Sequence, residues 1–434
     1  MTGNLYQSIE CRKRTGRRRA AARWAAAIVF ALPVFSASGQ ILLGPLGQAA
    51  GPPTPGFPTT VGGYPTLPGG SSNTMGDANR FKYNLRLDVS ALYDTNIFIS
   101  NTNRVADYQF TISPGVTLGF GDVFRRKENY IRLDYSPSFQ FFARNPSQNN
   151  IGQAFLLDGV YNTGKATWRF AQGITVLNGA DTDVGTRVTR QIYATTVGLS
   201  YLVSDKTFVD FSGTFAYQHF HDELDNWTAS GGAYLNYIYS PKLTIGLGVV
   251  GGYTAVSGNV DPDQTFEQAN LKFTYQVTGK ILLNATVGVQ FLQFQGARSA
   301  YVTPVFTVSG VYQPFDGTTV TLTAGRHVQP SASTEGQNFT TTGVTLAIRQ
   351  RFIQRLYLTL TGGFENSAYF AIVPQAVANR NQDYLTGSIG LDYMVREGWT
   401  VGAFYLNRQA FGNAASAPFN FVDNQVGIRS TVSF

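Results

Sequence analysis

From Lys82 to the C-terminus, apolar and polar residues alternate with a period of two in segments of about 10 to 15 residues. In the first segment Leu85 and Leu87 lie on one face, whereas Arg86 and Asp88 lie on the other. This length suits tilted strands that cross a membrane, because a strand in a soluble sandwich has about 5 or 6 residues. The pattern predicts an all-β fold, an antiparallel transmembrane β-barrel spanning 81–434, with apolar side chains toward lipid.

Short segments rich in Gly, Pro, Asp and Lys separate the alternating ones and supply the backbone angles of tight hairpins. We expect eight periplasmic turns, at 163–165, 204–206, 240–242, 278–280, 316–317, 125–127, 349–355 and 396–398. We expect nine outer loops between them, at 98–104, 144–150, 179–187, 221–226, 257–264, 296–299, 329–335, 371–380 and 412–420. Strict alternation of turns and loops predicts about 18 strands, and a count of 16 stays open.

The last ten residues, QVGIRSTVSF, form one more alternating strand that ends in an aromatic residue. We expect this strand to pair with the first, so that no strand edge is left unbonded in lipid. The candidate barrel-assembly signal within it is Gly427, Val432 and Phe434.

The N-terminus has the features of a targeting segment. Residues 1–39 contain seven Lys or Arg residues and one acidic residue, and an apolar run, 24–35, ends near Ala37-Ser38-Gly39. This arrangement predicts a cleaved signal peptide over 1–39, and an N-terminal anchor helix is the alternative. The only cysteine, Cys11, lies in this segment, so the exported chain would contain no thiol.

Residues 40–80 contain seven prolines and many glycines. This composition predicts a disordered periplasmic segment. The alternative is a plug that enters the barrel.

Charge does not point to nucleic acid. Without residues 1–39, the 33 basic residues fall to 26 and the 26 acidic residues fall to 25, so the net charge of +7 becomes +1. Outside the N-terminus there is no apolar run of about 18 residues, which excludes a helical membrane protein.

Catalytic and metal-binding motifs are scarce. The chain has three histidines, His219, His221 and His327, and no nucleophile motif stands beside His327. The run His219-Phe220-His221-Asp222 supplies too few ligands for a closed metal site. We therefore expect no enzyme activity, no metal and no cofactor.

The remaining candidates are charged residues on the polar faces of the strands, which would line the pore. They are Arg86, Asp88, Arg132, Asp134, Arg169, Asp210, Lys272, Arg326, Arg349, Glu365, Asp392 and Arg429. Basic and acidic members balance, so strong ion selectivity is not expected. A barrel of this size is wide enough for an aqueous channel. The pattern therefore favours an outer-membrane channel for passive diffusion of small hydrophilic solutes.

The opening strand LRLDVSALYDTNIF, with Tyr93-Asp94-Thr95-Asn96-Ile97-Phe98, the signal segment, the hairpins and Phe434, resembles the outer-membrane β-barrel porin family, type 2 group, of Gram-negative bacteria. The resemblance covers about residues 80 to 434 and implies the outer membrane as location, with lipid, lipopolysaccharide and the barrel-assembly machinery as partners. It also implies a link to exopolysaccharide, so the alternative is a non-conducting or secretion-associated surface barrel that exports or anchors polysaccharide. The sequence leaves the oligomeric state open.

Overall fold

The computed structural model describes residues 81–124, 126, 129–258, 262–295, 300–373 and 380–434. The predicted signal peptide and Pro/Gly-rich segment lie outside these residues. Within them the chain forms eighteen strands of 12 to 17 residues and two short 3-10 helices, η1 (Pro146–Gln148) and η2 (Ala414–Phe419). The strands are β1 (Lys82–Asp94), β2 (Asp107–Gly121), β3 (Tyr130–Phe142), β4 (Asn150–Asn162), β5 (Ala166–Asp181), β6 (Thr186–Leu202), β7 (Thr207–Phe220), β8 (Asn226–Ser240), β9 (Leu243–Val256), β10 (Gln264–Thr278), β11 (Ile281–Phe294), β12 (Tyr301–Tyr312), β13 (Thr318–Pro330), β14 (Gln337–Ile353), β15 (Leu356–Ala371), β16 (Asn381–Arg396), β17 (Trp399–Gly412) and β18 (Phe421–Ser433).

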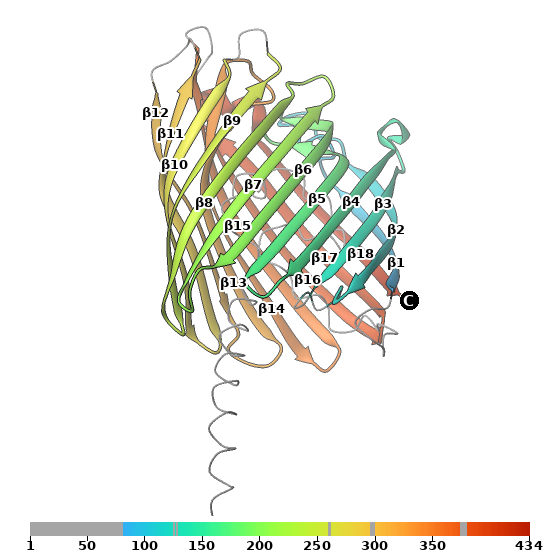
Figure 1. The fold of residues 1–434 in the computed structure, drawn as a ribbon. Coiled ribbons are helices and arrows are strands. Elements are labelled where there is room, and N and C mark those ends of the chain that lie inside the picture. Colours follow the sequence, from blue (N-terminus) through green and yellow to red (C-terminus); the bar gives the residue numbers. More distant parts are fainter. Residues whose placement is uncertain (1–80, 125, 127–128, 259–261, 296–299, 374–379) are drawn as a thin grey trace, which may run out of the picture.

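Each strand pairs antiparallel with its neighbours in sequence, and β1 pairs with β18, so the sheet closes into a barrel of tilted strands (Figure 1). The closing register runs from Arg86↔Ser433 to Asp94↔Gln425. The predicted antiparallel barrel of about 18 strands is confirmed. No helix in the described part of the chain is long and apolar enough to cross a membrane.

Alternation sets the two faces of the wall. Along β2 the outward Tyr108, Phe110 and Ile112 are 43 to 48% exposed, whereas Gln109 and Thr111 are buried. A strand with period two must place its apolar set on one side of the sheet. The apolar set points outward here, so the outer face suits lipid and the inner face is polar.

The connections between strands lie at the predicted turns and loops, with some differences in length. β4 ends at Asn162 and β5 begins at Ala166, which leaves the predicted tight turn at 163–165. The prediction of a turn over 349–355 was wrong in extent, because β14 pairs with β15 as far as Ile353. The predicted outer loop 179–187 is likewise shorter, because β5 and β6 pair up to Asp181↔Thr186.

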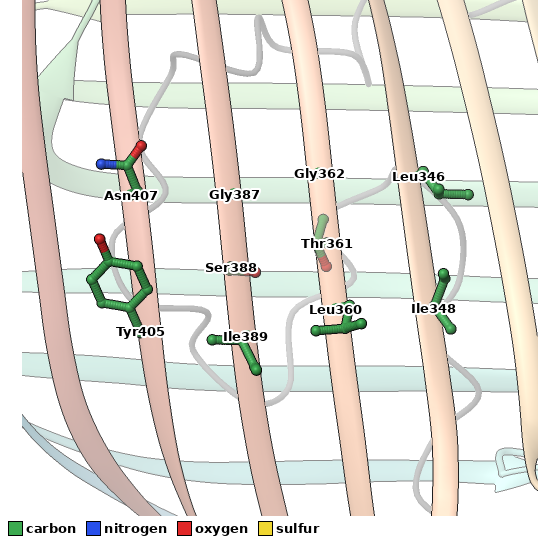
Figure 2. A pocket seen from close by; sticks show the side chains of 10 residues that line it. All are labelled: Leu346, Ile348, Leu360, Thr361, Gly362, Gly387, Ser388, Ile389, Tyr405 and Asn407. Atoms are coloured by element: carbon green, nitrogen blue, oxygen red, sulfur yellow. The ribbon is translucent and has the colours of Figure 1, made fainter.

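A shallow hollow of about 390 Å³ lies on the outward face of β14–β17. Figure 2 shows Leu346, Ile348, Leu360 and Ile389 around its floor, which Gly362 and its cross-strand partner Gly387 form. These leucine and isoleucine side chains share the outward side of their strands with Phe364, which is exposed. The hollow is therefore a feature of the apolar exterior and not of the lumen.

Candidate functional site: the lumen wall and the outer mouth

Charged side chains on the inner wall form pairs that reach across strands. Arg86 on β1 donates two hydrogen bonds to Asp134 on β3, at 3.1 and 3.0 Å. Thr117 on the intervening β2 donates to the same carboxylate at 2.6 Å. Arg86 also lies 3.7 Å from Asp88, which accepts a hydrogen bond from Thr431 at 2.7 Å. Paired charges of this kind keep their hydrogen bonds while only partly exposed.

Arg132, Lys272 and Arg429 form three further ion pairs on the inner wall. We call the ion pairs of Arg86, Arg132, Lys272 and Arg429 the wall belt. Arg132 Nε lies 2.8 Å from an Asp158 oxygen, and Lys272 Nζ lies 3.2 Å from an Asp210 oxygen. Arg429 donates to both oxygens of Asp392, at 2.9 and 2.6 Å. Bidentate pairs fix the orientation of the guanidinium as well as its charge.

Glycines in the intervening strands let these side chains lie flat along the wall. A Cβ at Gly115 would lie 2.6 Å from Arg86 Nε, and a Cβ at Gly402 would lie 2.2 Å from Asp392 Oδ1. A Cβ at Gly246, between Asn236 and Lys272, would lie 2.4 Å from the Asn236 side-chain oxygen. The belt residues therefore run along the sheet where a larger neighbour would turn them toward the lumen axis.

The other candidate pore-lining residues have different surroundings. Arg169 donates to Ser200 at 3.4 Å, and the Arg349 guanidinium lies 4.8 Å from the Tyr357 ring centroid. Glu365 is buried, on the outer half of β15. Arg326 does not lie on the expected polar face. It is four residues after the outward-facing Leu322 on the same strand, so it belongs to the same, outward side. It lies where β13 separates from β12.

The candidate assembly residues all lie at the closing seam. Gly427 pairs with Leu92, and a Cβ there would lie 2.7 Å from the Leu92 side chain. Val432 pairs with Leu87 on one side and with Trp399 on the other. Phe434 exchanges two backbone hydrogen bonds with Leu85, at 2.7 and 3.3 Å, and its side chain is 65% exposed.

At the outer end the wall is interrupted between β12 and β13. Their pairing runs from Tyr312↔Val320 only to Phe306↔Arg326. Beyond it β12 continues to pair with β11 as far as Tyr301, and β13 continues to pair with β14 as far as Pro330. Residues 302–305 and 327–330 therefore lack the strand pairing with each other that the register would give them. Arg326 bridges the junction, donating to Thr342 at 2.7 Å and to Thr303 at 3.4 Å.

Past this junction the ends of β13–β15 fold into the lumen; we call residues 327–342 and 369–372 the flap. Val328 and Phe370 have the same parity as the outward Leu322 and Phe364. Val328 is nevertheless buried, in a cluster whose other members are Tyr234, Val250, Phe266, Leu292, Phe294 and Ile372. All of these except Ile372 point inward from β8–β11, so the back of the flap packs on the inner wall.

Two further contacts fix the flap against that wall. Gln264 on β10 and Asn338 exchange amide hydrogen bonds at 3.1 and 2.8 Å. Phe370 stacks on Tyr301 with ring centroids 4.4 Å apart. The Gln264–Asn338 hydrogen bonds and the Phe370–Tyr301 stack thus bury the side of the flap that its strand parity would place outward.

The front of the flap meets the loop between β5 and β6, from the opposite side of the ring. Asp183 accepts hydrogen bonds from Ser331 at 3.0 Å and from the Ala332 amide at 2.7 Å. Arg380 lies 3.7 Å from the same carboxylate and donates to the Asp183 carbonyl at 2.8 Å. We call these contacts of Asp183 with Ser331, Ala332 and Arg380 the latch. It joins opposite walls across the outer mouth.

Burial governs the electrostatics of the latch. It raises the pKa of the Asp183 carboxyl, and nearby Asp181 adds to the rise, while Arg380 and the Ala332 and Ser331 hydrogen bonds oppose it. Arg380 is also held by aromatic rings, 4.3 Å from the Tyr369 centroid and 3.5 Å from the Phe419 centroid. The flap is therefore packed and hydrogen-bonded around the buried Asp183 carboxyl.

The histidines do not form a common site. His219 Nδ1 lies 2.8 Å from Asp225, and His221 Nε2 lies 3.5 Å from Asp222 in the loop beyond β7. His327 is buried in the flap, and neither ring nitrogen has a hydrogen-bond partner. Among the described residues no three His, Cys, Asp or Glu side chains are placed to hold a metal ion.

Sequence reasoning missed the latch and Asp158. Asp158 lies in a segment where both faces are mixed, so its inward position carried no clear signal. Asp183, Ser331 and Arg380 lie at or beyond strand ends, where period two gives no direction. Ser331 and Arg380 are about 150 and 200 residues from Asp183 in the sequence, so only the folded barrel brings them together.

No family model and no curated relative matches the chain. Solved structures similar to it include the outer membrane protein OpdK from Pseudomonas aeruginosa, at 12% identity and a TM-score of 0.42, over 81% of this chain and 99% of that one. OccK2 (OpdF) from Pseudomonas aeruginosa overlaps at 11% identity and a TM-score of 0.42, over 82% and 98%. The copper transporter OprC overlaps at 10% identity and a TM-score of 0.42, over 79% and 63%. The fold assignment rests on the strand pairing of this chain and not on these overlaps.

Proposed function

We propose that this protein is an outer-membrane channel for passive diffusion of small hydrophilic solutes. The observation that carries the proposal is the wall belt, whose charged side chains lie flat beside glycines. A barrel of 16 to 18 strands has a lumen too wide for side chains to fill, and flat side chains leave its axis to water. The chain would be exported by the signal peptide, residues 1–39, which is cleaved after Gly39, and would then insert into the outer membrane.

Conductance in planar bilayers tests the proposal. Purified, folded protein should give discrete current steps, and because the belt is paired the steps should discriminate weakly between cations and anions. A heat-dependent shift in gel mobility shows that the inserted protein is folded. Folded protein that inserts and passes no current under any condition would contradict the channel proposal.

The latch favours a second candidate, a surface barrel that does not conduct. Its contacts join opposite walls at the outer mouth. Such a barrel would anchor or guide a polysaccharide, as the sequence resemblance implies. Binding of a polysaccharide to cells that carry the protein, with no conductance from the purified barrel, would favour this candidate over the channel.

A further inference from the structure

We propose that the flap is a gate that swings between the inward position seen here and a position in the barrel wall, where β12 and β13 pair along their full length. This inference rests on the proposed channel function. It makes the outer mouth a two-state element in place of a fixed constriction.

The existing register defines the second position. Continuing from Phe306↔Arg326, the next pairs are Val305↔His327 and Thr303↔Gln329. All four residues are strand residues that already pair with their other neighbour. The wall could therefore close without any change in β11–β12 or β13–β14 register.

The flap keeps the sequence pattern of a barrel wall. Val328 and Phe370 would return to the lipid side, and His327, Gln329 and Thr341 would face the water of the lumen. In the inward position, both His327 ring nitrogens, Gln329 Nε2 and Thr341 Oγ1 are buried without hydrogen-bond partners. Burial of an unpaired polar group is unfavourable, so the inward position carries a free-energy penalty that the wall position relieves.

The inward position has its own compensation. It buries Val328, Ile372 and Phe370 against the inner wall and gains the latch. The extended β12–β13 pairing would also be weak, because Pro304 and Pro330 have no N–H to donate. Each position satisfies what the other leaves unsatisfied, which is the condition for a switch between states of similar free energy.

A row of glycines marks the hinge. Gly325 on β13 pairs directly with Gly343 on β14, one residue below the Arg326↔Thr342 pair where β13 leaves β12. On β15, Gly363 and Gly362 lie two and three residues before Glu365, the partner of Gly343, and pair with Thr345 and Leu346. Glycines weaken a strand and permit sharp bends. The three strands can bend together along this line.

Paired cysteines test the gate, because the only native cysteine, Cys11, lies in the predicted signal peptide. The variant Thr303→Cys/Gln329→Cys joins residues that pair only in the wall position. The variant Asp183→Cys/Ser331→Cys replaces the latch with a covalent link in the inward position. Ser309→Cys/Thr323→Cys is the matched control, because these residues already pair in the structure and neither is a hinge glycine.

Each variant is oxidised in membranes, checked for folding by heat-modified gel mobility and recorded in planar bilayers before and after dithiothreitol. We expect Thr303→Cys/Gln329→Cys to cross-link and to conduct continuously. We expect oxidised Asp183→Cys/Ser331→Cys to conduct about tenfold less than after reduction. The control should cross-link without a change in current.

Two results overturn the gate while the channel stands. One is a folded Thr303→Cys/Gln329→Cys protein that never cross-links although the control does. The other is a conducting latch variant whose current is the same oxidised and reduced. If neither the wild type nor any variant conducts, oxidised or reduced, the proposed channel function is contradicted.

Discussion

Arg429 on β18 reaches Asp392 on β16 across Gly402 of the strand between them, and both guanidinium–carboxylate hydrogen bonds are short, at 2.9 and 2.6 Å. Asp392 pairs with Gly402, and Gly402 pairs with Arg429, so the three residues form one row across the sheet. The absence of a Cβ at the middle position is what allows the two long side chains to meet flat against the wall.

Gly402→Ala should therefore break this pair. The added Cβ would lie 2.2 Å from Asp392 Oδ1, so either the carboxylate or the backbone must move. Overpacking of this kind costs about 1–3 kcal/mol, which a urea titration of the barrel folded in lipid vesicles would measure. The side chains forced off the wall should also lower the single-channel conductance.

Gly387→Ala is the matched control for that substitution. Gly387 lies on the adjacent strand β16, and a Cβ there meets nothing within 4 Å. Its unfolding free energy and conductance should equal those of the wild type. Equal destabilisation by both substitutions would show that loss of any barrel glycine is harmful and that the row is not special.

Ion selectivity should respond to the charge balance of the belt. Arg86→Gln removes the cation that Asp134 and Asp88 share, so the wall gains net negative charge and the channel should favour cations. The reversal potential under a salt gradient measures the shift. Arg396→Gln, at the periplasmic end of β16, removes the same charge outside the belt and should leave the reversal potential unchanged.

Period-two alternation predicted the barrel because every strand needs one face for lipid and one for the lumen. It gave the correct faces of Leu85, Arg86 and Asp88 and the hairpin positions, since these depend only on neighbours in sequence. The closing pair of β1 and β18 followed from the same logic, because an open edge in lipid is costly.

The flap could not be predicted in that way. Val328 and Phe370 carry the pattern of lipid-facing residues, and the pattern is silent on whether the strand that bears them stays in the wall. Arg326, which we expect on the polar face, instead has the strand parity of the outward Leu322. The inward fold is set by the packing of Val328 on Phe266 and Leu292 and, separately, by the latch, and both join residues that are distant in sequence.

The terminal residue should contribute to closure through its backbone. Deletion of Phe434 removes both hydrogen bonds with Leu85, whereas Phe434→Ala keeps them and removes only an exposed ring. Unpaired strand edges in lipid cost several kcal/mol, so we expect the deletion to lower the folded fraction in synthetic vesicles more than the substitution does. The heat-modifiable fraction on gels measures both. A larger loss from Phe434→Ala would assign the effect to the ring.

Closure of the mouth should depend on pH through Asp183. Its pKa is raised when buried in the latch, so the closed state binds a proton more tightly than a state in which the carboxyl is hydrated. The groups that face it are Asp181, Arg380, Glu223 and Tyr369, and Arg190 pairs with Asp181. Closure is then favoured at low pH and weakens as pH rises from the ordinary carboxyl pKa of about 3.9 to the raised value.

The measurement is open probability in planar bilayers across this pH range, at constant salt. Open probability should rise with pH and then level off above the raised pKa. Glu223 adds to the same trend, because burial and the nearby Asp183 and Asp181 carboxylates raise its pKa as well. In Asp183→Asn the carboxyl is replaced by an amide that can still accept a hydrogen bond from Ser331, so most of the pH response should disappear. A response that survives Asp183→Asn and is lost in Glu223→Gln would place the titrating group in the loop between β7 and β8.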